Sequence, residues 1–232
     1  MYKRSNHNTL YCFSPAVMVI TIMIELGLTG WMLGKYVTRT PQRLIIALLV
    51  FLAAFQIAEF NVCGVHPIQL LWSRLGYVFI TTLPALSLDL VVRLRGNAKL
   101  RPLTDFGYAM AALFIIGFSF LPSSLNSGVC TGNYVIFLLS EPLGVFYGMY
   151  YMGLEILGLI LSFLPEPKAK IKHQSALRWM GVAYLTLLVP SFIIYIVLPA
   201  TRVAIPSIMC GFAVLFALIT ALKVAPLISK KR

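Results

Sequence analysis

The sequence predicts an all-α integral membrane protein, a bundle of seven transmembrane helices that forms a single domain over residues 1–232. Hydrophobic residues make up 59% of the chain and charged residues only 11%, and the mean hydropathy is +0.88. A water-soluble domain of this length needs far more polar surface. Seven apolar runs approach the roughly 20 residues that cross a hydrocarbon core, where helices satisfy their own backbone polar groups. Lys and Arg gather in alternate gaps between these runs.

The first three runs each have a recognisable boundary. Pro15–Tyr36 is too long for the apolar core of a signal peptide, and no small-residue cleavage motif follows it, so we expect it to remain as a helix. Leu44–Val62 begins shortly after Pro41, at a helix edge where a missing N–H costs little. Trp72–Val92 opens on a tryptophan, which suits an anchor at the membrane–water interface.

The last four runs are also bounded by proline or by basic residues. Phe106–Leu121 ends directly before Pro122, and Pro142–Leu164 begins on a proline. Trp179–Leu198 follows a basic stretch, and Pro206–Ile228 begins on another proline.

The Lys and Arg residues predict the direction of the chain through the membrane. Fifteen of the 19 lie in the first, third and fifth gaps, after the seventh span, or within the adjoining ends of the first and seventh spans, and four lie on the other side. The side richer in Lys and Arg faces the cytoplasm, so we expect the N-terminus outside and the C-terminus in the cytoplasm. This clustering accounts for the net charge of +12 without a nucleic-acid partner. We expect the basic cytoplasmic face to attract anionic lipids of the bilayer.

Three of the four cysteines are expected on the outer, oxidising side of the membrane. A disulfide between Cys63 and Cys130 would join the second and fourth loops, although Cys12 could replace either partner. Cys63 and His66 also have a spacing found in metal sites, but no second pair follows, so we expect neither metal nor cofactor. Cys210 lies in the seventh span and is expected to be a small buried side chain.

Two carboxyl groups, those of Glu25 and Glu155, are expected near the middle of the membrane. A charge there costs about 2.5–3.5 kcal/mol on insertion scales, so such residues face the bundle, pair or become protonated. Residues three and four apart share a helix face, which places Tyr151 beside Glu155. We therefore expect Glu25, Glu155 and Tyr151 at a deep polar ligand site. The alternative is structural: a protonated carboxyl that donates a hydrogen bond to a neighbouring helix.

A second polar group is expected near the outer surface. Gln56 and Glu59 share one face of the second span, and Arg74 and Tyr77 share one face of the third, just after Trp72. The connection between these spans is short, so they are expected to be antiparallel neighbours with a Glu59–Arg74 ion pair. We predict that these five residues line an outer ligand pocket, and packing of the two helices is the alternative role.

Asp89 and Arg93 lie four residues apart at the cytoplasmic end of the third span. This spacing predicts an ion pair within one helix.

Several of these residues also carry a family resemblance. The second span ends with "AEF", the third opens with "WSRLGYVF" and continues through Pro84, and "KHQSALRWMGVAYLTLLVP" leads from a basic loop into the sixth. Over nearly the whole chain, this pattern resembles the N-terminal seven-helix region of bacterial membrane histidine kinases and related signalling proteins. The resemblance implies that Glu59, Trp72, Arg74, Tyr77 and Pro84 form a sensing core near the outer surface. The sequence stops where such proteins continue into an output domain.

A rival resemblance concerns the third span. The segment "ITTLPALSLDL" is similar to the third helix of microbial rhodopsins. Retinal, however, needs a lysine in the middle of the seventh helix for its Schiff base. Lys223 lies near the cytoplasmic end instead, which argues against this reading.

These observations predict a non-enzymatic, receptor-like sensor module, multi-pass in the plasma (inner) membrane. We expect it to detect a small or lipidic ligand, or a membrane state, and to signal to a separate cytoplasmic protein, with self-association into a homo-oligomer left open. One alternative is a small proton- or cation-coupled transporter that uses Glu25 and Glu155. Another is an oligomerising membrane effector. A membrane enzyme is disfavoured because the sequence has no His-rich cluster, paired Asp motif or nucleophile elbow.

Overall fold

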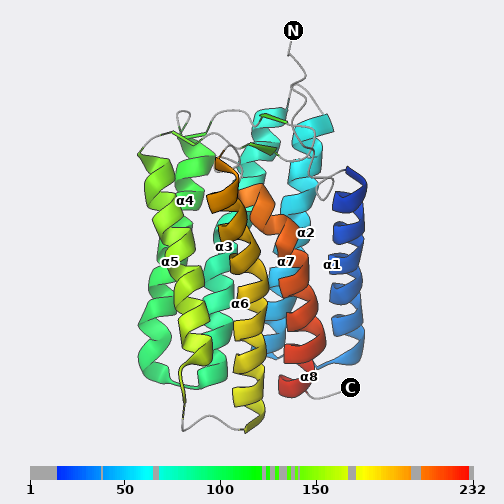
Figure 1. Ribbon diagram of the computed structural model, residues 1–232, viewed down its shortest axis with the longest axis vertical. Coiled ribbons are helices and arrows are strands. Elements are labelled where there is room, and N and C mark those ends of the chain that lie inside the picture. Colours follow the sequence, from blue (N-terminus) through cyan, green and yellow to red (C-terminus); the bar gives the residue numbers. More distant parts are fainter. Residues whose placement is uncertain are drawn as a thin grey trace.

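The chain forms a bundle of helices joined by short connections (Figure 1). The computed structural model describes residues 15–37, 39–64, 68–121, 124–125, 129–130, 135–136, 139–140, 142–166, 171–199 and 205–229. Its helices are α1 (Pro15–Lys35), α2 (Thr40–Gly64), α3 (Gln69–Arg95), α4 (Arg101–Phe120), α5 (Leu143–Phe163), α6 (Ile171–Val197), α7 (Ile205–Ile219) and α8 (Ala225–Ile228). A 3-10 turn, η2 (Ala98–Leu100), precedes α4, and a π-helical turn, η4 (Thr220–Val224), joins α7 to α8.

The predicted all-α class and the seven membrane-spanning helices are confirmed. In the described residues, seven helical segments are long and apolar enough to cross a membrane, the last of them comprising α7, η4 and α8. A two-residue antiparallel pair, β1 (Val129–Cys130) with β2 (Val135–Ile136), lies in the connection between α4 and α5 and leaves the class unchanged. By length and composition, the chain is a multi-pass membrane protein.

The helices extend further at one end than the hydropathy pattern predicts. α6 begins at Ile171, whereas its apolar run begins at Trp179, and the fourth span begins at Ala98 rather than at Phe106. Hydropathy detects the part of a helix that lies in hydrocarbon. The added turns carry polar and basic residues, which continue the helix beyond that layer.

Helix α3 forms the centre of the bundle. It packs against α2, α4, α5 and α6, and 78% of its most apolar 18-residue segment is buried, against 22% for α1. α1 stands at one edge, where it contacts α2 and α7 (Figure 1). A movement of any of these four neighbouring helices is therefore expected to shift side chains of α3.

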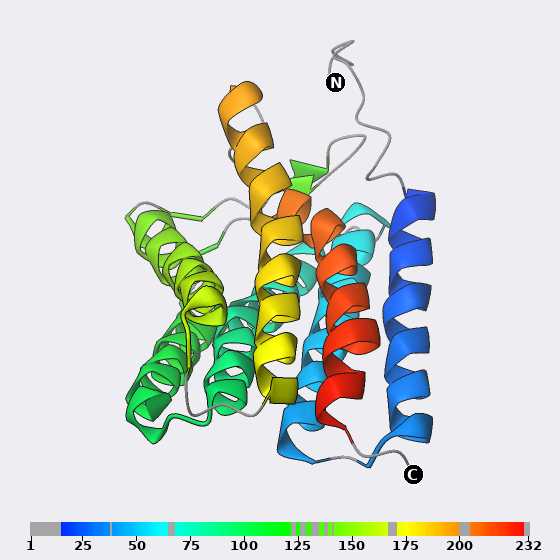
Figure 2. The ribbon, with the colours of Figure 1, turned by 60° about the horizontal axis from the view of Figure 1, so that its bottom comes forward.

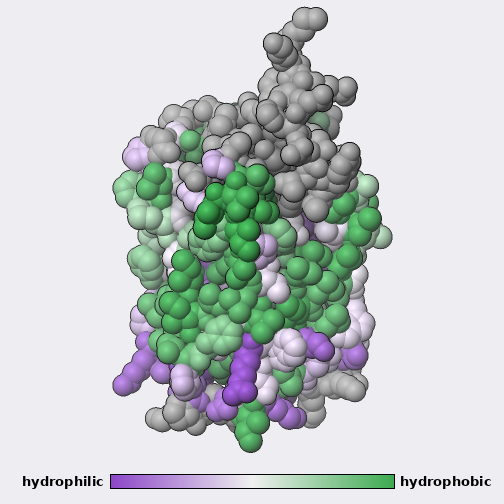
Figure 3. Space-filling view, in the orientation of Figure 1, coloured by the Kyte–Doolittle hydropathy of each residue, from purple (hydrophilic) through white to green (hydrophobic). Residues whose placement is uncertain are grey.

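Charge is distributed unequally between the two ends of the bundle. Apart from Arg74, every Lys and Arg in the described part of the chain lies at or near the end where α1 finishes and α2 begins. We call this the basic end and the opposite one the far end. Figure 3 shows a broad apolar band across the visible face of the molecule and hydrophilic residues below it, at the basic end. This band matches a lipid-facing surface, and the predicted cytoplasmic location of the basic end remains a prediction.

At the basic end, buried Arg95 joins α3 to the end of α5. Its guanidinium donates to the backbone oxygens of Leu161 (2.6 Å) and Leu164 (2.9 Å) and to the carboxylate of Glu166 (3.0 Å). The last carbonyl groups of a helix have no hydrogen-bond donor within the helix, so the guanidinium of Arg95 supplies the missing donors. α3 itself ends at Gly96, whose φ of 67° is the left-handed conformation that glycine adopts at little cost.

Two glycines bring α5 and α6 into close contact in the half of the bundle toward the basic end. A Cβ built on Gly158 of α5 would overlap the phenol of Tyr184 on α6. A Cβ built on Gly181 of α6 would lie 2.5 Å from the ring of Phe163 on α5. We call these two contacts the glycine clamp. Beyond it the helices diverge toward the far end in both ribbon views (Figures 1 and 2).

Candidate functional site

The space between the diverging helices is a pocket in the far half of the bundle. It has a volume of about 640 Å³, which lies within the range of small-molecule sites. α3, α5, α6 and α7 supply its walls. The lining includes Tyr77 and Ile80 of α3; Val145, Tyr147, Gly148, Tyr151 and Met152 of α5; Leu188, Ser191, Phe192 and Tyr195 of α6; and Ile205, Pro206 and Met209 of α7.

One wall of the pocket is a cluster of buried aromatic rings. The ring of Tyr77 lies 4.7 Å from that of Phe118 on α4 and 5.4 Å from that of Tyr147 on α5, measured between centroids. Phe114 of α4 contacts Tyr147 edge-on at 5.3 Å. Such pairs contribute about 0.5–1.5 kcal/mol each beyond the area they bury. The α3–α4–α5 wall is therefore well fixed.

Hydrogen bonds add to the rigidity of this wall. The hydroxyl of Thr81 on α3 donates to the hydroxyl of Tyr147 at 3.1 Å. The hydroxyl of Tyr150 donates to the backbone oxygen of Thr81 at 2.7 Å. Both bonds are buried, so water competes with them less than it does with hydrogen bonds at the surface.

The rim of the pocket reaches the lateral surface of the bundle. Val145 of α5 is 54% exposed, and Phe192 and Tyr195 of α6 are 42% and 43% exposed, although all three line the pocket. These side chains belong to helical segments that match a membrane span. The rim of the pocket therefore includes exposed side chains of α5 and α6 near the far end of the bundle, on the surface that lipid would cover.

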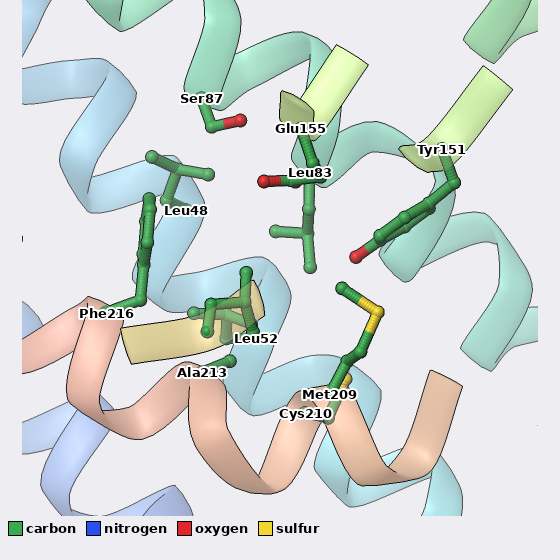
Figure 4. A pocket seen from close by; sticks show the side chains of 11 residues that line it. Leu48, Leu52, Leu83, Ser87, Tyr151, Glu155, Met209, Cys210, Ala213 and Phe216 are labelled. Carbon is green, nitrogen blue, oxygen red and sulfur yellow. The ribbon is translucent and has the colours of Figure 1, made fainter. Parts of the chain in front are cut away.

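A smaller cavity of about 20 Å³ lies deeper in the bundle, and Figure 4 shows its lining. Tyr151 and Met209 line both cavities, so they form the partition between them. Beyond them lie the hydroxyl of Ser87 and the carboxyl group of Glu155. One Glu155 oxygen is buried and has no hydrogen-bond partner among the described residues. The space suffices for one water molecule, which needs a roughly 10–15 Å³ cavity and two or more polar partners.

Glu25 lies in a separate polar cluster between α1 and α2. Its carboxylate accepts a hydrogen bond from the side-chain amide of Gln56 at 3.1 Å, and the hydroxyl of Thr21 donates to the amide oxygen of Gln56. All three side chains are buried. Glu25 and Gln56 line neither of these two cavities, and the expected deep ligand site that joins Glu25 to Glu155 stays a prediction.

The predicted Glu59–Arg74 ion pair is wrong. Buried Glu59 accepts a hydrogen bond from the hydroxyl of Ser207 on α7, and Arg74 donates to the backbone oxygen of Ser119 on α4 at 3.0 Å. α2 and α3 are neighbours as expected. Glu59 of α2, however, meets α7, whereas Arg74 of α3 meets α4. Spacing along one helix does not determine which neighbour its polar face meets.

The remaining sequence predictions have mixed outcomes. Asp89 and Arg93 form the expected ion pair at 2.8 Å, and the hydroxyl of Tyr108 donates to the second Asp89 oxygen at 3.2 Å. Trp72 is half-buried and packs against the core, and it lines neither cavity. Lys223 lies 5.4 Å from the ring of Trp179 near the basic end, away from the middle of the seventh span.

Of the predicted ligand residues, Tyr77 and Tyr151 line the pocket, and Glu155 lies beyond its partition. The sequence patterns did not indicate the α6 wall, formed by Ser191, Phe192 and Tyr195. These residues belong to an apolar run that gives no linear signal of a cavity. Gly148 matches a close-packing glycine spacing, but a Cβ there would meet nothing within 4 Å, because it faces the pocket.

Cys63 is disulfide-bonded, as predicted for the outer cysteines. Its partner lies outside the described side chains, so pairing with Cys130, or with Cys12, stays a prediction. Cys210 is a free, buried thiol that lines the smaller cavity.

No protein-family model, curated protein or solved structure matches this chain. The resemblance to the seven-helix region of histidine kinases therefore remains a prediction.

Proposed function

We propose that this chain is a receptor-like membrane sensor that binds a small or lipidic ligand in the pocket between α3, α5, α6 and α7. The observation that carries the proposal is the pocket itself, about 640 Å³ in volume and placed within the spans. The two sides of the pocket are not held equally firmly. The α3–α5 side is fixed by rings and buried hydrogen bonds, whereas the α6 side diverges from α5 beyond the glycine clamp.

A ligand in this pocket would signal by moving α6 relative to α5. It can shift the bundle only if it binds one arrangement better than another. α6 runs from the pocket to the basic end, where Trp179 contacts Lys223 of η4. We propose that the basic end faces the cytoplasm of the plasma membrane and meets a separate signalling protein there, beside anionic lipids.

The first test is a search for that partner. Native membranes would be cross-linked, solubilised in mild detergent and purified by the tagged chain, and the proteins would be identified by mass spectrometry. A kinase, cyclase or regulator recovered in near-equal amount supports the sensor. Recovery of self-cross-links and lipid alone counts against it.

The second test measures the proposed movement. Spin labels at Met149→Cys and Ile196→Cys report the distance between α5 and α6 at exposed far-half positions. Labels at Ile156→Cys and Leu185→Cys, on the same helices near the clamp, form the control pair. Addition of native lipid extract should change the first distance and leave the second unchanged. A constant far-half distance in all lipids argues against ligand-dependent movement.

A proton-coupled transporter is the second candidate function. The observation in its favour is Glu155, a buried carboxyl group directly beyond the pocket partition with one unpartnered oxygen among the described residues. Buried carboxyls within a membrane span commonly serve proton or ion pathways. Uptake into vesicles driven by a pH gradient, and lost in Glu155→Gln, would favour this candidate over the sensor.

A further inference from the structure

We infer that the pocket accepts an uncharged, single-chain lipid, which enters from the far leaflet of the bilayer between α5 and α6. The inference rests on the proposed function, because it names the ligand class of the same pocket. It depends on three features: the chemistry of the lining, the position of the opening and the depth of the polar groups.

The lining favours a neutral ligand. None of its described residues is charged, and most are aliphatic, aromatic or methionine side chains. A phosphate, carboxylate or ammonium group inside would lie without a counter-ion, and burial of an unpaired charge is costly. The hydroxyls of Tyr151 and Tyr195 can instead serve a hydroxyl, carbonyl or ester group. The hydroxyl of Ser191 donates to the backbone oxygen of Leu187 at 2.7 Å, so it can accept a hydrogen bond from a ligand hydroxyl.

The position of the opening favours entry from lipid. Val145, Phe192 and Tyr195 are each about half exposed on the lateral surface, and the large neighbours Phe146 and Ile196 are more exposed still. In a bilayer these side chains face lipid close to the far interface rather than bulk water. A ligand dissolved in the membrane therefore reaches the pocket without crossing an aqueous phase.

The depth of the polar groups suggests how such a lipid would lie. Tyr195 is two residues from the far end of α6, whereas Tyr151 is eight residues from the far end of α5. At 1.5 Å per residue, Tyr151 is about 12 Å deep along its helix. A lipid head at the level of Tyr195 stays near the interface. Its chain then extends toward Met152 and Met209, whose flexible side chains adapt to an apolar ligand.

The test uses photoactivatable lipids in vesicles that contain the full chain. One probe is a long-chain alcohol with a diazirine near the middle of its chain. The other is the sulfate ester of the same alcohol, which is identical except for a permanent charge. We expect the alcohol to label peptides of α5 and α6 that line the pocket, and we expect excess unlabelled alcohol to remove the signal. The sulfate ester should label them at least tenfold less.

Two glycine variants locate the label. Gly148→Leu places a side chain in the pocket, where a Cβ meets nothing within 4 Å, and should reduce labelling by the alcohol at least fivefold. Gly153→Leu adds the same side chain to an exposed position of α5 outside the pocket and should leave labelling unchanged. Thermal unfolding of both variants checks that each is folded.

The possible outcomes separate the lipid from the function. Equal labelling by the alcohol and its sulfate, or labelling that Gly148→Leu does not reduce, overturns the neutral-lipid inference. If Gly148→Leu nevertheless changes the distance between labels at Met149→Cys and Ile196→Cys, the pocket still controls α6 and the proposed sensor stands. If the alcohol labels the pocket as expected but that distance never changes, the site is lipid-binding and the sensor fails.

Discussion

The phenol of Tyr184 on α6 lies directly against Gly158 of α5, so that even a methyl group at position 158 would overlap its hydroxyl. Gly158 is thus required by packing rather than by backbone conformation. The reciprocal contact of Phe163 with Gly181 repeats the arrangement on the partner helix. Together they fix where α5 and α6 touch and where the pocket between them begins.

The first prediction concerns this contact. Gly158→Ala should lower the free energy of unfolding by about 1–3 kcal/mol, because the added methyl overpacks a buried interface. Thermal unfolding in detergent measures the effect. Gly153→Ala on the same helix meets nothing within 4 Å and is the matched control. The packing explanation fails if both variants melt at the same temperature.

The second prediction concerns the buried arginine at the basic end. Arg95→Met should destabilise the fold by about 3–5 kcal/mol, since it leaves a buried carboxylate and two helix-end carbonyls without their donor. Lys99→Met, at an exposed position of the 3-10 turn η2 that follows α3, is the control, and a change of about 0.5 kcal/mol or less is expected there. Similar losses in both variants would show that Arg95 acts only as a surface charge.

The third prediction separates the observed partner of Glu59 from the expected one. A double-mutant cycle between Glu59→Ala and Ser207→Ala should give a coupling energy of about 0.5–3 kcal/mol, because the two side chains share a buried hydrogen bond. The cycle between Glu59→Ala and Arg74→Met should be additive to about 0.3–0.5 kcal/mol. Strong coupling in the second cycle would restore the ion pair that the sequence predicts.

The fourth prediction concerns the polar cluster between α1 and α2. Gln56→Leu removes the amide that donates to Glu25 and should cost about 1–3 kcal/mol, the penalty for a buried polar group without its partner. Asn61→Leu, one turn further along α2, breaks only an exposed bond to Ile57 and is the control. An equal, small effect of both changes would show that the cluster contributes nothing to stability.

The spans were predictable because each depends on local composition. Long apolar runs require helices, and the basic residues between them define one end. The Asp89–Arg93 pair was predictable for the same reason, since both partners lie on one helix. The partners of Glu59 and Arg74 were not, because they depend on how each helix is rotated against its neighbours. A single sequence does not contain that rotation.

The pocket was predictable only in part. Tyr151 stood out through its spacing from Glu155, and Tyr77 through the polar face of the third span. The α6 wall gave no signal because its residues are as apolar as those that face lipid. The cavity arises from the angle between α5 and α6, which two glycines outside the pocket determine: Gly158 lies six residues from Met152, and Gly181 lies seven residues from Leu188. Glycine is common in apolar runs, so its presence in the sequence does not show where two helices touch. Only the three-dimensional structure shows that these two glycines set the contact between α5 and α6.

The glycine clamp divides α6 into two arms of equal length. Tyr184 lies 13 residues from Ile171 and 13 residues from Val197, which corresponds to about 20 Å on each side. The arm toward the basic end contains no proline, whereas the arm beside the pocket contains Pro190, which removes one backbone hydrogen bond. The pocket arm is therefore the softer of the two. A small occupant of the pocket would bend α6 locally at Pro190 and leave the arm toward the basic end in place. Only an occupant too large for this local bend would tilt that arm. The movement at the basic end would therefore begin above a threshold size of the occupant and would not grow in proportion to it.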